Sequence, residues 1–85
     1  MDTLLFVAER GVERFEIIEG ECGEGFYVVR YSQGLSTHDY LQNDVPMAHR
    51  CAEDEWGLPA SAWRAALPDE LPLWRQPGAN SPDSD

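Results

Sequence analysis

Four segments in the first half of the chain carry the alternating or β-branched apolar pattern of β-strands. Arg10-Gly11 and Gln33-Gly34 are tight-turn signals between neighbouring segments, and the glycine-rich stretch 20–25 reads as a flexible connection. Such short connections join strands that run antiparallel. The pattern therefore predicts a four-stranded antiparallel meander over residues 3–9, 12–19, 26–32 and 35–42.

After the strands the apolar spacing changes to that of an amphipathic helix. Asp44 is a suitable N-cap, and Pro46 is tolerated in the first turn, where its missing N–H has no intrahelical partner. Gly57 can adopt the left-handed C′ conformation, and Pro59 prevents continuation. These signals predict a helix over residues 45–56. Its apolar stripe comprises Val45, Ala48, Ala52 and Trp56, and its polar remainder comprises His49, Arg50, Glu53 and Asp54.

The order of elements predicts an α+β fold of the form ββββα, in which the helix packs on one face of the sheet. Residues 59–66 are predicted to form a short helical turn that returns Trp63 to the core. We therefore place a single domain at residues 1–66. Residues 67–85 form an acidic, proline-rich tail, which we expect to be disordered at least after residue 76.

The strand at 26–32 is apolar on both faces, whereas one helix can cover only one face of a sheet. Something else must then cover the second face. The candidates are the apolar residues 71–74 of the tail or a second copy of the chain, which would make a homodimer through that face.

Charge narrows the choice of partners. The 85 residues include 16 acidic and 6 basic side chains, a net charge of −10. Phosphates would be repelled, so direct binding to nucleic acid or to an anionic membrane is disfavoured and a basic protein is the favoured partner. The first residues match neither a signal peptide nor a membrane span. With two widely spaced cysteines, this indicates a reducing, cytoplasmic location.

No arrangement of reactive side chains predicts a catalytic site. Adjacent residues such as His38 and Asp39 point to opposite faces of a strand. Ser36 and His38 would share a face but lie about 7 Å apart, too far for a nucleophile and its base. The spacing of the cysteines and histidines matches no metal motif, so we expect no cofactor and no metal. Cys22 is more consistent with an exposed thiol in a turn.

Acidic side chains supply the candidate interaction residues. One group lies in the second strand, where the plainer explanation is protection of a sheet edge by charge. The other occupies the last helical turn, where the helix dipole favours cations, although Arg50 can pair with Asp54 one turn away. A tryptophan in the apolar part of the tail completes the set. The candidate residues are Glu13, Glu16, Glu19, Glu53, Asp54, Glu55 and Trp74.

One part of the chain resembles a known group of sequences. THDYLQ at 37–42, an acid-capped helix with alanines at 48 and 52, an aromatic-Gly pair at 56–57 and Trp63-Arg64 resemble short bacterial proteins without an assigned activity. The likeness covers about residues 26–64, and Pro46 replaces the usual acidic residue of that helix start. The resemblance implies one continuous structural unit and no particular activity.

These observations predict a small, non-catalytic, acidic protein-interaction or regulatory module. A second interpretation is an inhibitor, immunity-like or nucleic-acid-mimicking protein that occupies the basic site of an enzyme. A third, from another class, is a minor enzyme or accessory subunit with a pocket around His38, Tyr40 or Cys22. A pocket lined by these side chains would favour the enzyme, and a flat acidic face would favour binding.

Overall fold

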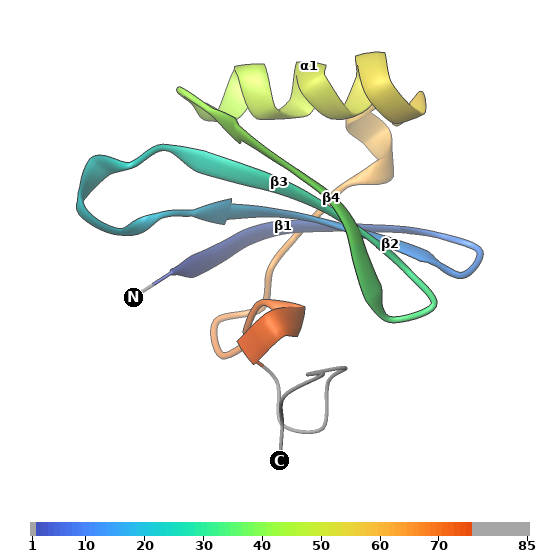
Figure 1. The fold of residues 1–85 in the computed structure, drawn as a ribbon, viewed down its shortest axis with the longest axis horizontal. Coiled ribbons are helices and arrows are strands. Elements are labelled where there is room, and N and C mark those ends of the chain that lie inside the picture. Colours follow the sequence, from blue (N-terminus) through green and yellow to red (C-terminus); the bar gives the residue numbers. More distant parts are fainter. Residues whose placement is uncertain (1, 76–85) are drawn as a thin grey trace.

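A computed structural model describes residues 2–75 of the chain. Four strands form an antiparallel meander and a helix follows (Figure 1). A short fifth strand joins the far edge of the sheet. The strands are β1 (Thr3–Arg10), β2 (Glu13–Glu19), β3 (Phe26–Ser32), β4 (Leu35–Gln42) and β5 (Arg64–Ala65). Their spatial order is β4-β3-β2-β1-β5. The predicted α+β fold with a ββββα order is confirmed.

The helix α1 (Val45–Trp56) begins and ends where the sequence predicts. The Asp44 carboxylate accepts a hydrogen bond of 2.8 Å from the backbone N–H of Met47. Gly57 has φ of 70°, in the left-handed region, and its N–H reaches back to the last turn. Leu58 is buried directly after this cap. Both ends of the helix are therefore fixed by local side-chain and backbone chemistry.

The connection between β2 and β3 is more ordered than the predicted flexible loop. It contains the 3₁₀ turn η1 (Glu21–Gly23), and the N–H of Gly20 donates to the carbonyl of Gly25 at 2.8 Å. Gly25 has φ of 126°, and a Cβ there would lie 2.6 Å from the carbonyl oxygen of Gln42. A glycine is required at this position because the end of β4 passes so closely.

The predicted short helical turn after the helix is present but shorter than 59–66. It is the 3₁₀ turn η2 (Ala60–Ala62), and the chain then extends into β5. Arg64 and Ala65 pair antiparallel with Val7 and Phe6 of β1. Two residues are too few to show an alternating pattern, and their partner strand lies at the other end of the chain. A sequence pattern could therefore not predict this strand.

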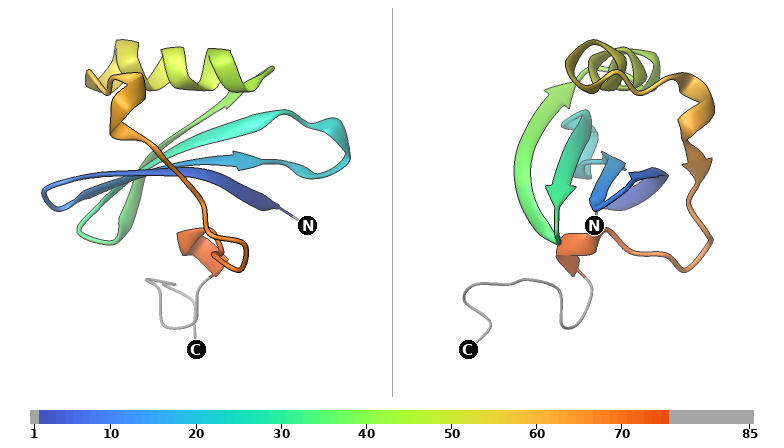
Figure 2. Two further views of the ribbon diagram at one scale, coloured as in Figure 1. Left: turned by 180° about the vertical axis from the view of Figure 1, so that it is seen from behind. Right: turned by 90° about the vertical axis from the view of Figure 1, so that its right-hand side faces the viewer.

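The core between the sheet and α1 contains the larger apolar cluster. Its buried members come from β1, β2, β3 and α1, together with Leu58, and the helix lies across one face of the sheet (Figure 2). Trp56 and Trp63 pack against this cluster but are only partly buried. The buried residues are Ala8, Phe15, Ile17, Val28, Ala48, Ala52 and Leu58.

Two β-bulges interrupt the regular alternation of side chains between the two faces of the sheet. The register shifts between Leu4 and Phe6 of β1, which leaves Leu5 without an opposite residue. A second shift leaves Thr37 unpaired in β4, so that Ser36 lies opposite Tyr31 and His38 opposite Arg30. Since paired residues share a face, Ser36 and His38 lie on opposite faces. The prediction that they share one is wrong, because simple alternation does not anticipate a bulge.

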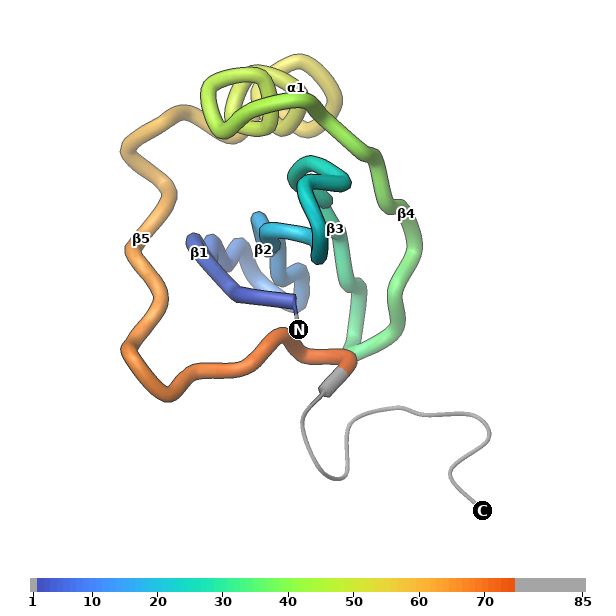
Figure 3. The backbone as a smooth tube through the Cα atoms, turned by 90° about the vertical axis from the view of Figure 1, so that its left-hand side faces the viewer, coloured from blue at the N-terminus to red at the C-terminus, as the bar shows by residue number. Residues whose placement is uncertain are grey.

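Residues 67–75, which we call the strap, cover the second face of the sheet. Figure 3 shows the chain descending past β1 after α1 and then crossing beneath the sheet. Pro72 is fully buried, and Leu73, at the start of the 3₁₀ turn η3 (Leu73–Arg75), packs against the second apolar cluster. This cluster contains Leu4, Val7, Ile18, Val29 and Tyr31.

The strap resolves a choice that the sequence left open. Of the two predicted covers, the apolar residues 71–74 and a second copy of the chain, the first is present. The strap therefore belongs to the folded unit, although the sequence pattern had assigned it to the tail. The disorder predicted after residue 76 concerns residues outside the described part of the chain.

Candidate functional site

Glu16, a candidate for the acidic interaction surface, is buried. Its side chain has no exposed area and lies between the sheet and the strap, where Leu73 donates its backbone N–H to the carboxylate at 3.0 Å. Arg14 Nε also donates to it, at 2.8 Å. Burial raises the pKa of Glu16, and the hydrogen bond from Arg14 opposes part of this shift. The prediction that Glu16 belongs to an exposed surface is wrong, because the strap covers this face of β2.

Glu13 is only partly exposed and is paired with two arginines of the same chain. It accepts hydrogen bonds from Arg30, which lies beside it on β3, and from Arg10 Nε at 3.0 Å. These contacts, with Arg30 the larger, lower the pKa of Glu13. Of the three predicted glutamates of β2, only Glu19 is exposed. The explanation of these acids as edge protection is wrong too, since β1 and β3 flank β2 on both sides.

A third internal group of charges fastens the strap. Glu70 accepts two hydrogen bonds of 2.9 Å from the guanidinium of Arg64, and one of 3.0 Å from the N–H of Leu67. These contacts, with Arg64 the largest cause, lower the pKa of Glu70 to about 2. Arg14 lies 3.5 Å from the same carboxylate. Arg14 therefore links Glu16 on the sheet to Glu70 on the strap.

These pairs change the charge that the surface presents. Four of the six arginines, Arg10, Arg14, Arg30 and Arg64, are paired with glutamates that are buried or partly buried. The predicted pair of Arg50 and Asp54 is present but loose, with its atoms 3.9 Å apart and both side chains largely exposed. The positive charges are thus mostly used within the fold, while Glu53, Asp54 and Glu55 are exposed at the end of α1.

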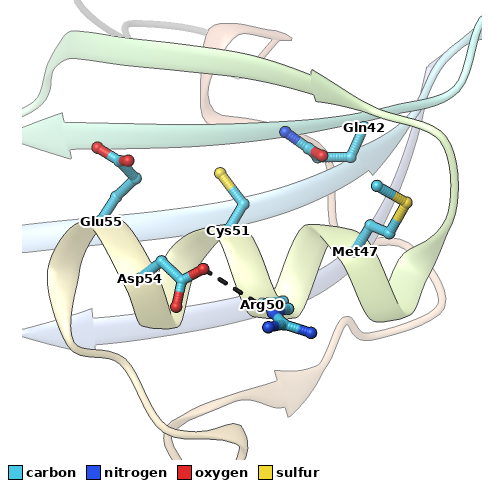
Figure 4. A pocket seen from close by; sticks show the side chains of 6 residues that line it. All are labelled: Gln42, Met47, Arg50, Cys51, Asp54 and Glu55. Carbon is cyan, nitrogen blue, oxygen red and sulfur yellow. Dashed lines mark ion pairs between the residues drawn. The ribbon is translucent and has the colours of Figure 1, made fainter.

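An open cleft of about 280 Å³ lies beside these acids, between α1 and the end of β4. Figure 4 shows Cys51 and Glu55 projecting from the helix toward β4, with Gln42 above them. Burial, and then the charges of Glu55 and Asp54, raise the pKa of the Cys51 thiol. A thiol held in its neutral form is a poor nucleophile. The lining residues are Gln42, Met47, Arg50, Cys51, Asp54 and Glu55.

The residues named for an enzyme site are brought together only in part. The rings of His38 and Tyr40 are stacked with centroids 6.4 Å apart, and both contact Trp56. The Tyr40 hydroxyl donates to Glu55 at 3.2 Å, and burial followed by this carboxylate raises the pKa of Tyr40. Cys22 is exposed in the turn that precedes β3. His38 lies opposite Arg30, toward the other end of β3, and is therefore separated from this turn. The three candidates therefore do not line one pocket.

His49 occupies a position that the sequence pattern did not predict. Although assigned to the polar side of the helix, it packs between Phe6 and Trp63, with ring centroids 5.0 and 5.3 Å away. Burial lowers the pKa of His49. Its Nδ1 and the Nε1 of Trp63 are buried and form no hydrogen bond within residues 2–75. The return of Trp63 to the core places aromatic rings on this side of α1, which helical spacing alone cannot reveal.

Within the same described residues, no three His, Cys, Asp or Glu side chains are grouped so that they could hold a metal ion. The helices among them include none that is long and apolar enough to cross a membrane. Comparisons of the chain with protein-family models, with curated proteins and with solved structures find no match. The resemblance to short bacterial proteins stays a prediction.

Proposed function

We propose that this protein is a cytoplasmic, non-catalytic interaction module that binds a basic surface of another protein. One observation carries the proposal: four arginines are already paired with buried or partly buried glutamates of the same chain, while the acids at the end of α1 remain exposed. The exposed field is therefore more uniformly negative than the order of charges along the sequence suggests. Such a field accelerates the encounter with a cationic partner.

The interpretation as an inhibitor or nucleic-acid mimic is a special case of this proposal, in which the basic partner is an enzyme. The enzyme interpretation has less support. His38 and Tyr40 are adjacent, but Cys22 lies elsewhere, and the thiol next to the cleft is held neutral. An activity would then require groups that a second chain supplies.

The experiment begins with affinity capture of a partner from the native host, followed by measurement of association rates at 10 mM and 150 mM salt. The Debye length falls from about 30 Å to about 8 Å over this range, so a steered encounter slows strongly. We expect the variant E53Q/D54N/E55Q to associate more slowly than wild type and to depend less on salt.

A matched control places the same charge change elsewhere. The variant E9Q/E19Q/D69N removes three negative charges from other exposed positions. If the end of α1 is the docking region, this control keeps an association rate closer to that of wild type. Equal rates and equal salt slopes for wild type and E53Q/D54N/E55Q would contradict the proposal.

A further inference from the structure

The outer edge of β4 is the open edge of the sheet. Among residues 2–75, β4 pairs with β3 on one side and with no strand on the other, whereas β5 covers part of the outer edge of β1. Proteins usually protect such an edge by shortening it, or with bulges, lysine or proline. Here the bulge at Thr37 interrupts only the first half of an eight-residue strand. The residues after the bulge, 38–42, contain neither proline nor lysine, so none of them lacks a backbone N–H for pairing.

On the helix side this edge adjoins the cleft described above. The helix residues Met47 and Cys51 provide apolar and polarisable walls, Gln42 at the end of β4 provides an amide, and Asp54 and Glu55 provide carboxylates. This combination fits a long cationic side chain, whose methylene stem packs on sulfur while its charged head meets the acids. Arg50 is loosely paired and 82% exposed, so an incoming cation can displace it from Asp54.

On the strap side the same edge adjoins apolar surface. Leu41 and Trp74 are 53% and 41% exposed. Tyr27 connects them, since it lies opposite Leu41 in the sheet and contacts the Trp74 ring edge-on, with centroids 6.3 Å apart. The two sides of this strand edge therefore differ. The helix side has the cleft carboxylates, and the strap side has exposed apolar groups together with the single carboxylate of Asp39.

We infer that residues 38–42 of β4 accept an additional strand from a basic, extended segment of a partner protein. Arginine or lysine at alternate positions of that segment enters the cleft at Asp54 and Glu55, and the apolar residues between them lie on Leu41 and Trp74. Strand addition supplies main-chain hydrogen bonds, and the alternate side chains supply specificity. This inference rests on the proposed function, because it takes the partner to be basic.

Charge complementarity favours a basic segment of another protein over a second copy of this chain as the strand that pairs with β4. Each copy carries a net charge of −10. Pairing two β4 edges would bring two sets of cleft carboxylates together, and each cleft holds only the loosely paired Arg50 to offset them. Like charges facing each other across an interface disfavour such a pair.

Synthetic peptides of equal composition test the inference on the full chain. One alternates arginine and valine, and a second has the same residues in two blocks. Two further alternating peptides carry N-methyl groups on every second amide, each in one of the two frames. We expect the alternating peptide to bind at least about tenfold more tightly than the block peptide. It should also slow hydrogen exchange at amides within 38–42. Only one N-methylated frame should lose binding, because only alternate amides face the neighbouring strand.

Two single variants test the cleft. Glu55→Gln removes a lining carboxylate but keeps an oxygen that can accept the hydrogen bond from the Tyr40 hydroxyl. Glu53→Gln removes the same charge from the same helical turn, at a position that does not line the cleft. We expect E55Q to weaken binding of the alternating peptide several-fold more than E53Q does. Equal losses would overturn the assignment of the cleft.

The remaining outcomes separate this inference from the proposed function. If block and alternating peptides bind equally and leave residues 38–42 unprotected, strand addition is overturned while binding to basic partners stands. If no cationic peptide binds at low salt, both are overturned. Protection of 38–42 without any peptide, together with a dimeric mass in light scattering, would overturn the inference in favour of a second copy.

Discussion

The backbone N–H of Leu73 donates to both carboxylate oxygens of Glu16, at 3.0 and 3.2 Å, across 57 positions of the chain. A fully buried carboxylate on a central strand thus holds the strap against the sheet. The strap in turn encloses Glu16 and keeps it from water. Each element depends on the other, so the charge state of Glu16 is coupled to the folding of the strap.

This coupling predicts a particular pH dependence. Burial raises the pKa of Glu16 above its ordinary value of 4.5. The folded state therefore binds a proton at the Glu16 carboxylate more tightly than the unfolded state does. The contribution of Glu16 to the free energy of unfolding therefore decreases as pH rises from about 4.5 through the folded-state pKa. We expect the stability of Glu16→Gln relative to wild type to increase between pH 4 and pH 7 in urea titrations. Glu19→Gln, an exposed position on the same strand, is the matched control. A constant difference for E16Q would contradict the coupling.

Glu70 should show the opposite sign. Its pKa is lowered to about 2, so its contribution is present above the ordinary value of 4.5 and is lost as pH falls from there toward 2. We expect Glu70→Gln to be less stable than wild type by about 1 kcal/mol at pH 7, typical of a hydrogen-bonded ion pair near the surface. The difference should shrink by pH 2.5. Asp69→Asn, at the exposed neighbouring residue, serves as control. A difference that persists at low pH would assign the loss to packing.

Truncation tests the strap as a whole. A chain that ends after Ala66 lacks the cover of the second cluster and exposes Val7, Ile18 and Val29. We expect it to bind a hydrophobic dye and to self-associate or unfold, because a large apolar patch is unfavourable in water. A chain that ends after Arg75 keeps the strap and should be monomeric with a cooperative melt. Equal behaviour of the two chains in light scattering and thermal melts would show that the strap is dispensable.

Phe15 should contribute more to stability than Trp63, which the sequence predicts to return to the core. Phe15 is fully buried, whereas Trp63 is only partly buried. Phe15→Ala should cost about 3 to 5 kcal/mol, comparable to the whole stability of so small a domain. Trp63→Ala should cost roughly half as much, since less of its area leaves water. Denaturant titration of both variants checks this order, and a larger loss at Trp63 would reverse it.

The features that the sequence predicts correctly depend on neighbouring residues or on the pattern within one element. Asp44 and Gly57 define the ends of α1 through contacts within a few residues, so the helix bounds agree with expectation. The two apolar faces of β3 indicate that a second cover is needed, and Leu73 and Pro72 provide it. In each case one segment contains the whole signal.

The features that it misses depend on distant partners. Glu16 and Glu13 look like surface acids until the fold places Leu73 over the first and Arg30 beside the second. His49 looks exposed until Trp63 returns to its side of the helix. The cleft likewise cannot be predicted from any one segment, because it forms where the end of β4 meets α1. Pairing across the chain decides these positions, and no local pattern records it.

Arg10 explains how α1 tolerates an acidic C-terminus. Its Nη1 donates to the carbonyl of Trp56, the last helical residue, at 2.7 Å, and its guanidinium lies 5.4 Å from the centroid of the Phe15 ring. A cation at this end is favoured by the helix dipole and by the three preceding acids, which have no basic residue in their own turn.

Arg10→Met keeps an apolar stem beside Phe15 but removes the charge and the donors. We expect a loss of about 1 to 2 kcal/mol in the free energy of unfolding, measured by urea titration. Arg50→Met removes an exposed and loosely paired cation from α1 itself, and it should cost less than about 0.5 kcal/mol. The loss at Arg10 should also be smaller in the E53Q/D54N/E55Q background, because fewer negative charges then need a counter-ion. If the loss is the same in both backgrounds, Arg10 acts through its contacts with Trp56, Glu13 and Phe15, and the acids at the end of α1 are tolerated without it.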